Sequence, residues 1–453
     1  MCSSDLRAGT TRIDWVRNFS YPQPRTYTFS EIVTPEAGYV EGIDSTARTK
    51  RDLDTDPPGH TMSGLRLASV QRELQRLSPL FLFQMVKNPE RVSPTADVTV
   101  DGVSYPAVQY QAGDQKFTVA FDSTTGLPAR IRTLDYDNIW GDVTYDLVLS
   151  DWQTFDGTRV ATKAKYELNG RPVADIALTE FKTNVPVAAD RFSIPAAAAA
   201  KAAKPATGTV PYQWVLRRQF IGTYLDSDQP SYDPDTSAGL RLADLGPGIE
   251  QVTGGTHNSL IVEMRDHLIV FDAPVSDAQS NWTLAAAEKR FPGKPVKYLV
   301  LTHHHMDHAG GLRAYAARGA TLIVGKGSAE HFRRVLAAPF TRDPDLPSSD
   351  LSRTEIIEVG DRRVLTDGTR EVALYLIDNP HAEGMLLGYI PDARLGWVAD
   401  LWSPGRDPLP EKLNPNQAAL VAAVHKTGIT PLKFAGGHGS TADYAALAAL
   451  EGK

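Results

Sequence analysis

Four histidines and one aspartate occupy six consecutive positions in the second half of the chain: His303, His304, His305, Asp307 and His308. Imidazole nitrogens and carboxylate oxygens are ligands that zinc and related divalent metals prefer in proteins. Because His303 and His305 are two positions apart, their side chains point to the same side of an extended segment and can bind one ion. Asp307 and His308 follow and can bind a second ion. His304 points away from this pair, and we expect a structural role for it.

The flanking sequence predicts where this cluster lies. An apolar run, 296–301, precedes it and is typical of a buried strand. Two glycines follow, and then 312–318, which has helix-forming composition. The cluster is therefore expected on a loop at the carboxyl end of a strand, where metal sites of α/β sheets gather. The alternative, a solvated histidine-rich loop, does not account for an H-x-H-x-D-H pattern directly after an apolar strand.

The stretch resembles the signature of the metallo-β-lactamase-fold hydrolases, a resemblance that covers roughly 245–453. It implies that each metal has its own ligands: His303, His305 and His381 for the first, and Asp307, His308 and His438 for the second, with Asp400 bridging both. Asp272 matches a carboxylate that orients a metal-bound histidine. The implied cofactor is two zinc ions per chain, with iron or manganese as alternatives. The implied fold is an αββα sandwich.

A dinuclear zinc site can lower the pKa of a bridging water and direct the resulting hydroxide at a substrate. Asp400 and Asp307 are the candidate catalytic residues, the second as a possible proton donor. The true β-lactamases carry cysteine or serine where this chain has Asp400, which favours a small ester, lactone or thioester as substrate. The alternatives are a mononuclear iron persulfide dioxygenase, a β-lactamase, and an envelope ligand-binding protein that functions through its front half.

The remaining histidines match no ligand position. We expect His60, His257, His267, His331 and His425 to be surface or core residues. Aromatic side chains near the predicted loops are candidates for a substrate pocket, although plain packing is the commoner role for such residues: Trp214, Phe220, Phe340 and Trp402.

Length and composition favour a two-domain protein with a small-molecule substrate. The chain has 453 residues, 42% of them hydrophobic and 22% charged. The net charge of −7 argues against nucleic acid as a partner. No apolar run approaches the roughly 18 residues of a membrane span. The single cysteine, Cys2, excludes an internal disulfide. The oligomeric state is not predicted.

The sequence pattern of the first half of the chain predicts a mostly antiparallel β domain that also contains helices. We divide the chain into a polar segment with a strand or two (1–60), an antiparallel β domain (61–195), an Ala/Pro-rich linker (196–210) and the catalytic domain (211–453). The β domain resembles, by pattern alone, the half-barrel of bacterial outer-membrane-lipoprotein carriers. That resemblance implies a periplasmic or envelope location and a possible lipid contact. Residues 1–6 look foreign, so we expect the native start, with any signal peptide, to be missing.

Overall fold

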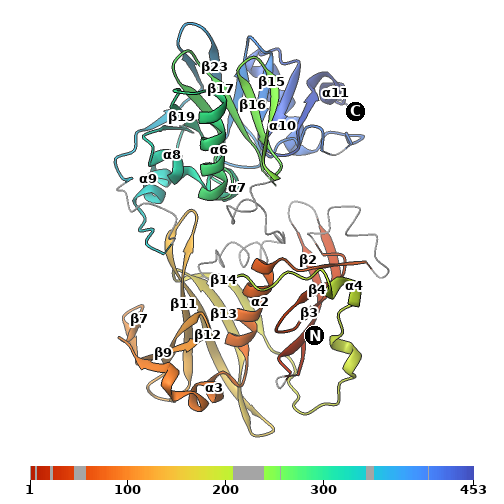
Figure 1. The fold of residues 1–453 in the computed structure, drawn as a ribbon, viewed down its shortest axis with the longest axis vertical. Helices are drawn as coiled ribbons and strands as arrows, with labels where there is room; N and C mark the ends of the chain where they lie inside the picture. Colours follow the sequence, from red (N-terminus) through yellow and green to blue (C-terminus); the bar gives the residue numbers. More distant parts are fainter. Residues whose placement is uncertain are drawn as a thin grey trace. The chain divides into compact units, whose positions relative to one another are not determined.

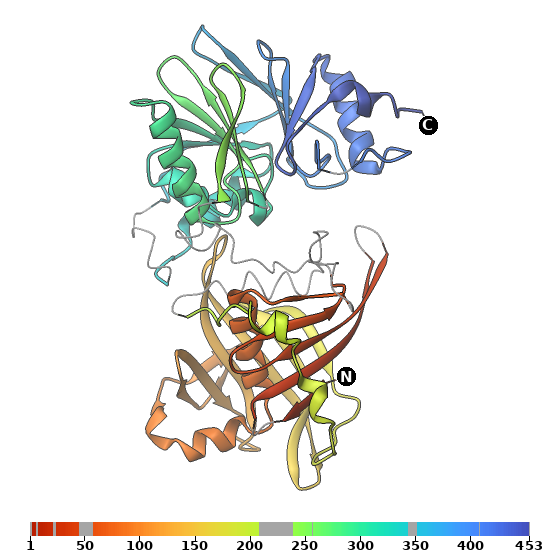
Figure 2. The same cartoon turned by 45° about the vertical axis from the view of Figure 1, so that its right-hand side comes forward.

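The computed structural model describes residues 2–5, 8–20, 24–44, 58–207, 239–255, 257–342, 351–406 and 408–452. The chain divides into two units, the first comprising 1–137 and 142–228 and the second 138–141 and 229–453. Two of the aromatic pocket candidates, Trp214 and Phe220, and the end of the expected linker lie outside the described residues. Figures 1 and 2 show each unit as a ribbon in two views.

The first unit begins with a sheet where we expected a polar segment with a strand or two. Its strands pair in chain order: β1 (Cys2–Asp5), β2 (Thr10–Phe19), β3 (Arg25–Val33), β4 (Gly38–Gly42) and β5 (Gly59–Thr61). The expectation was wrong because polar side chains cover part of this sheet. Arg12, for example, contacts Asp14 at 2.7 Å and Glu41 at 2.5 Å. Ion pairs of this kind hide the apolar alternation by which strands are recognised.

Helices and a second antiparallel sheet complete the first unit. The helices are α2 (Gly64–Leu77), α3 (Phe81–Lys87) and α4 (Ala196–Ala199). The sheet runs β14-β13-β12-β11-β10-β9-β6, and β7 pairs with β8 apart from it. The strands are β6 (Val92–Pro94), β7 (Val98–Val100), β8 (Val103–Tyr105), β9 (Ala107–Ala112), β10 (Gln115–Phe121), β11 (Pro128–Asp137), β12 (Gly141–Phe155), β13 (Thr158–Leu168) and β14 (Arg171–Ala177). The expected antiparallel β architecture is confirmed.

The second unit contains two mixed sheets. The first has the order β15-β16-β17-β18-β19-β20-β21 and the second β22-β23-β24-β25-β26-β27. Strands of the first are β15 (Arg241–Gly246), β16 (Ile249–Thr253), β17 (Ser259–Glu263), β18 (Leu268–Phe271), β19 (Val296–Val300), β20 (Thr321–Gly325) and β21 (Ile356–Val359). Strands of the second are β22 (Arg362–Thr366), β23 (Glu371–Leu376), β24 (Leu386–Ile390), β25 (Leu395–Val398), β26 (Lys433–Gly436) and β27 (Thr441–Asp443).

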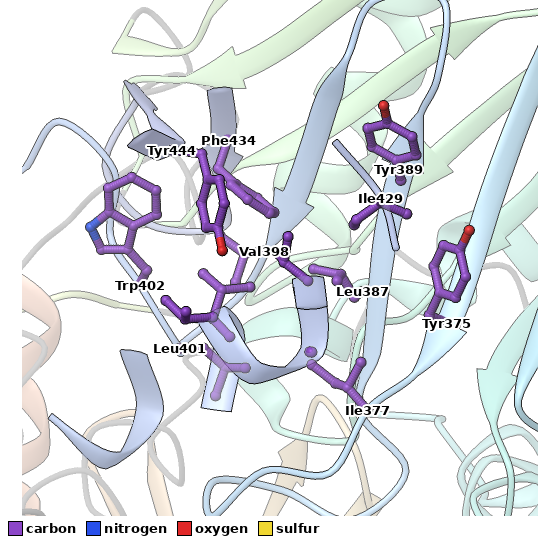
Figure 3. Close-up of a cluster of buried hydrophobic side chains, with 14 of the residues drawn as sticks. Tyr375, Ile377, Leu387, Tyr389, Val398, Leu401, Trp402, Ile429, Phe434 and Tyr444 are labelled. Carbon is purple, nitrogen blue, oxygen red and sulfur yellow. The ribbon is translucent and has the colours of Figure 1, made fainter. Parts of the chain in front are cut away.

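Two apolar cores bind these layers together. The first lies between the sheets and includes Phe271 and Val300 from one sheet with Trp397 from the other. The second core lies where the β22–β27 sheet packs against α10 (Pro415–Thr427) and α11 (Tyr444–Ala448). Figure 3 shows side chains of this second core. The remaining helices are α6 (Asp277–Arg290), α7 (Met306–Ala309), α8 (Leu312–Ala316) and α9 (Ala329–Ala337). This is the expected αββα sandwich.

The sequence predicts a helix over 441–450, but the structure begins this range with a strand. Residues Thr441–Asp443 instead form β27, which pairs with β26 and places Thr441 opposite Ala435. The helix α11 is therefore confined to Tyr444–Ala448.

Among the described helices, none combines the length and apolar character required to cross a membrane.

The core at β26 yields a stability prediction. Phe434 is fully buried and contacts Trp402 and Tyr444 edge-on, whereas Leu432, two residues earlier, is 55% exposed. Phe434→Ala should destabilise the second unit by about 3–5 kcal/mol because it leaves a cavity. Leu432→Ala should cost less than about 1 kcal/mol. Chemical denaturation followed by tryptophan fluorescence measures both, and equal effects would contradict the assigned packing.

Candidate metal centre

Loops that follow β16, β18, β19, β23, β25 and β26 carry a concentration of histidine and aspartate side chains. Parallel pairing explains part of this convergence. In the first sheet Phe271 of β18 is level with Val300 of β19, and in the second Val398 of β25 is level with Gly436 of β26. Each pair of strands therefore ends at the same sheet edge. The polar residues that follow these strands are brought together by that register.

One group consists of His303, His305, His381 and Asp400, whose candidate ligand atoms all lie within 4.8 Å of one another. The Nε2 atoms of His303 and His381 lie 3.1 and 3.0 Å from Oδ2 of Asp400. The Nε2 atom of His381 also lies 3.2 Å from Nδ1 of His305. Ligand atoms that share a tetrahedral zinc ion lie roughly 3.3 Å apart. The donor types and spacings of this group fit one divalent ion.

The second group consists of His257, Asp307, His308 and His438. His257 Nε2 lies 3.1 Å from Oδ2 of Asp307. The carboxylate of Asp400 reaches this group as well: its Oδ1 is 2.5 Å from His438 Nε2 and its Oδ2 is 3.2 Å from His308 Nε2. Asp400 therefore contacts histidines from both groups.

Buried nitrogen atoms support a metal in these positions. Nε2 of His303, Nε2 of His308 and Nδ1 of His438 are buried and make no hydrogen bond of acceptable geometry. Buried polar atoms normally have a partner, since leaving one unsatisfied costs about 1–3 kcal/mol. A metal ion would satisfy the Nε2 atoms that face Asp400. Histidine with carboxylate suits zinc and also iron or manganese, so the donor set does not select one metal.

Protonation states in the centre favour metal binding. Burial, reinforced by His303 and His381, lowers the pKa of His305 to about 3. Burial and the neighbouring His438 likewise lower the pKa of His257 to about 3. Burial alone would raise the pKa of Asp400, but His308 and His438 outweigh it and hold that pKa well below its usual range. Neutral imidazoles and an ionised carboxylate are the forms that bind metal ions. His308 is the exception: burial alone would lower its pKa, but Asp400 and Asp272 outweigh burial and raise that pKa well above its usual range, so a metal ion would displace a proton there.

Asp272 orients one of these histidines from behind. It is fully buried and accepts hydrogen bonds from the backbone N of Thr302 at 2.8 Å and from its Oγ1 at 2.9 Å. Its Oδ2 also lies 3.3 Å from Nδ1 of His308. When that nitrogen carries the hydrogen, Nε2 of His308 has the free electron pair that could bind a metal ion, and this atom faces Asp400. The same carboxylate thus holds both the end of β19 and the ring of His308.

The structure corrects two sequence-based expectations. His257, which we expected to be an ordinary surface or core residue, is 4% exposed and belongs to the second group. Its position directly before a strand was the one available signal. Trp402, a candidate for the substrate pocket, is instead buried in the apolar core against Phe434. The other expected outsiders belong to neither group: His60, His267, His331 and His425.

His304 and Phe340 have neighbours of their own. The His304 ring lies 4.9 Å from that of His305 and 5.6 Å from that of His331. The guanidinium of Arg313 lies over the ring of Phe340, with Cζ of Arg313 4.5 Å from the ring centre.

Asn379, which sequence reasoning did not single out, accepts a hydrogen bond from the backbone N of His381 at 2.8 Å and so shapes that loop.

Comparison with known proteins places this centre in a family context. Residues 252–438 match the model of the metallo-beta-lactamase superfamily. The chain is 27% identical over 149 residues to the 2,4-dinitroanisole O-demethylase subunit alpha of Nocardioides sp. (strain JS1661), covering 33% of this chain and 42% of that protein. It is 37% identical over 73 residues to a linear primary-alkylsulfatase of Pseudomonas sp., covering 16% and 11%. The matches span less than half the length of either relative.

Similar solved structures include a metallo-beta-lactamase from Pontibacter korlensis, with 17% identity over 47% of this chain and 98% of that chain and a TM-score of 0.36. Another is the stereoselective inverting sec-alkylsulfatase Pisa1 from Pseudomonas sp., with 18% identity over 46% and 40% and a TM-score of 0.35. The resemblance of the C-terminal half to the metallo-β-lactamase superfamily is confirmed by the family model.

The contacts of Asp272 predict its effect on metal binding. Asp272→Asn removes the charge that orients His308, and metal affinity should fall by about 10- to 100-fold. Inductively coupled plasma mass spectrometry after dialysis against a chelator measures the retained metal. Asp266→Asn is the matched control, because Asp266 is exposed and pairs with His267 outside both groups. Equal metal retention by the two variants would refute this role of Asp272.

Proposed function

We propose that this chain is a metal-dependent hydrolase that uses two zinc ions to cleave a small ester, lactone, thioester or related bond. The observation that carries the proposal is the position of Asp400, whose two oxygens contact histidines from both groups. A carboxylate placed in this way can bridge two ions. The match of 252–438 to a superfamily of metal-dependent hydrolases supports the same conclusion.

In this proposal the first ion would be held by His303, His305 and His381 and the second by Asp307, His308 and His438, with Asp400 shared. Two such ions would activate a water as nucleophile and polarise the bond under attack. The chain supplies the rigid donors and the charge of Asp400. Asp307 is our candidate for moving a proton, because its side chain is 20% exposed and can reach the solvent side of the centre.

The nature of the leaving group is the next part of the proposal. The names of both curated relatives, an O-demethylase subunit and an alkylsulfatase, describe substrates whose cleaved bond involves oxygen. A β-lactam instead releases nitrogen. The Asp400 bridge would also occupy the coordination position that a nitrogen leaving group uses. We therefore propose an oxygen or sulfur leaving group, with sulfate esters added to the substrates to be tested.

A single-iron persulfide dioxygenase is the second candidate. The group of His303, His305, His381 and Asp400 already offers four donors to one ion, which is the observation in its favour. Metal analysis separates the two candidates. The hydrolase requires about two zinc ions per chain, and the dioxygenase requires one iron.

Substrate preference tests the proposal directly. The zinc-loaded protein should hydrolyse its best ester, lactone or sulfate ester with a kcat/KM at least tenfold above that for any penicillin or carbapenem. Tenfold corresponds to about 1.4 kcal/mol of transition-state free energy, which one bridging ligand can supply. A spectrophotometric panel of these substrates with thioesters and phosphodiesters measures the ratio. A carbapenem that outperforms every ester tested would show that the protein is a β-lactamase.

Loss of a ligand tests the metal requirement. His305→Ala should reduce both bound zinc and turnover, the latter by at least 100-fold, because His305 donates to the first ion in this proposal. His425→Ala is the control, since His425 is exposed, pairs with Glu451 and belongs to neither group. Bound metal and kcat are measured on the same preparation. Full turnover by the His305 variant in the presence of chelator would refute metal-dependent catalysis.

A further inference from the structure

His257 belongs to the second group, but it comes from a loop outside the H-x-H-x-D-H signature. It lies between β16 and β17, and its ring centre is 4.4 Å from that of His438 and 5.5 Å from that of His308. Its Nε2 is 3.1 Å from Oδ2 of Asp307. Three imidazoles and one carboxylate thus converge in a largely buried space.

The loop that carries His257 is attached to the loop that carries His438. The backbone N of Asn258 donates to Gly437 O at 2.8 Å, and its side-chain amide donates to Gly436 O at 2.9 Å and Gly439 O at 2.8 Å. From the other side, Gln279 Nε2 donates to the backbone O of His257 at 2.9 Å. These bonds fix the backbone on both sides of the His257 ring. The ring is therefore held next to His438 by its neighbours.

We propose that His257 is a direct ligand of the second metal position. That position would then have four protein donors of its own, His257, Asp307, His308 and His438, in addition to Asp400. The inference rests on the proposed two-metal function and deepens it. A second position with four donors of its own would favour a two-ion centre over a single-iron centre.

The competing role for His257 is to donate a hydrogen bond that positions Asp307. Two substitutions of equal reach separate these roles. In His257→Gln the side-chain amide can still donate to Asp307 but is a poor zinc ligand. In His257→Glu the carboxylate can bind zinc but has no hydrogen to donate, and it repels Asp307. A ligand role favours the glutamate variant, and a positioning role favours the glutamine variant.

Calorimetric titration of metal-free protein with Zn²⁺ measures the affinity of each position. Wild type should bind two ions. His257→Gln should raise the Kd of one ion at least tenfold and leave the other unchanged, and His257→Glu should bind that ion at least tenfold more tightly than the glutamine variant. His267→Gln is the matched control, because His267 is also a buried histidine of the second unit but lies outside both groups. It should bind zinc as wild type does.

The outcomes are separable. If wild type binds two ions and His257→Glu does not exceed His257→Gln in affinity, the ligand assignment is overturned while the proposed function stands. If wild type binds fewer than two ions, the two-zinc function itself fails. Thermal melts of the metal-free variants verify that each is folded before titration.

Discussion

A carboxylate buried among four histidines is the constraint on which the second unit depends. The side chain of Asp400 is 11% exposed and lies near His303, His308, His381 and His438. An ionised carboxylate removed from water is costly unless charges or hydrogen bonds compensate it. Its partners come from three other loops, two of them on the same sheet and one on the facing sheet. The two sheets must therefore be held in a fixed relative position.

The apolar core between the sheets provides that position. Phe271 and Trp397 are fully buried in it, and each lies within a few residues of a polar residue of the centre. The chain turns sharply at both places. Asp272 has a φ of 58° and Asp400 a φ of 52°, values in the left-handed region that cost about 1 kcal/mol or more for a residue other than glycine. Side-chain contacts at Asp272 and Asp400 offset that cost, so packing and polar contacts support the same backbone.

The metal-binding residues and the side chains around them determine different parts of the reaction. Histidine and aspartate donors on rigid strand ends define a metal-binding arrangement that many reactions can use, since one fold supports many activities. What the substrate meets beyond the donors is determined by side chains on loops. In the second unit the aromatic candidate Trp402 is part of the core instead, where it packs on Phe434. Its burial removes Trp402 from the candidates for substrate contact.

The local pattern by itself determined much of this protein. Residues 303–308 follow an apolar strand, so their spacing alone predicted a metal site at a strand end. The resemblance to the metallo-β-lactamase-fold hydrolases then implied roles for Asp272, His381, Asp400 and His438. The αββα architecture followed from the resemblance that those residues carry. The tertiary structure alone decided the place of His257, because 50 residues separate it from Asp307 in the chain and only the packing of two loops joins them. It also decided the sheet in residues 2–61, where ion pairs on the strands conceal the apolar alternation, and the burial of Trp402. Short-range patterns record strands and ligand spacing, whereas contacts between distant loops depend on how the sheets pack.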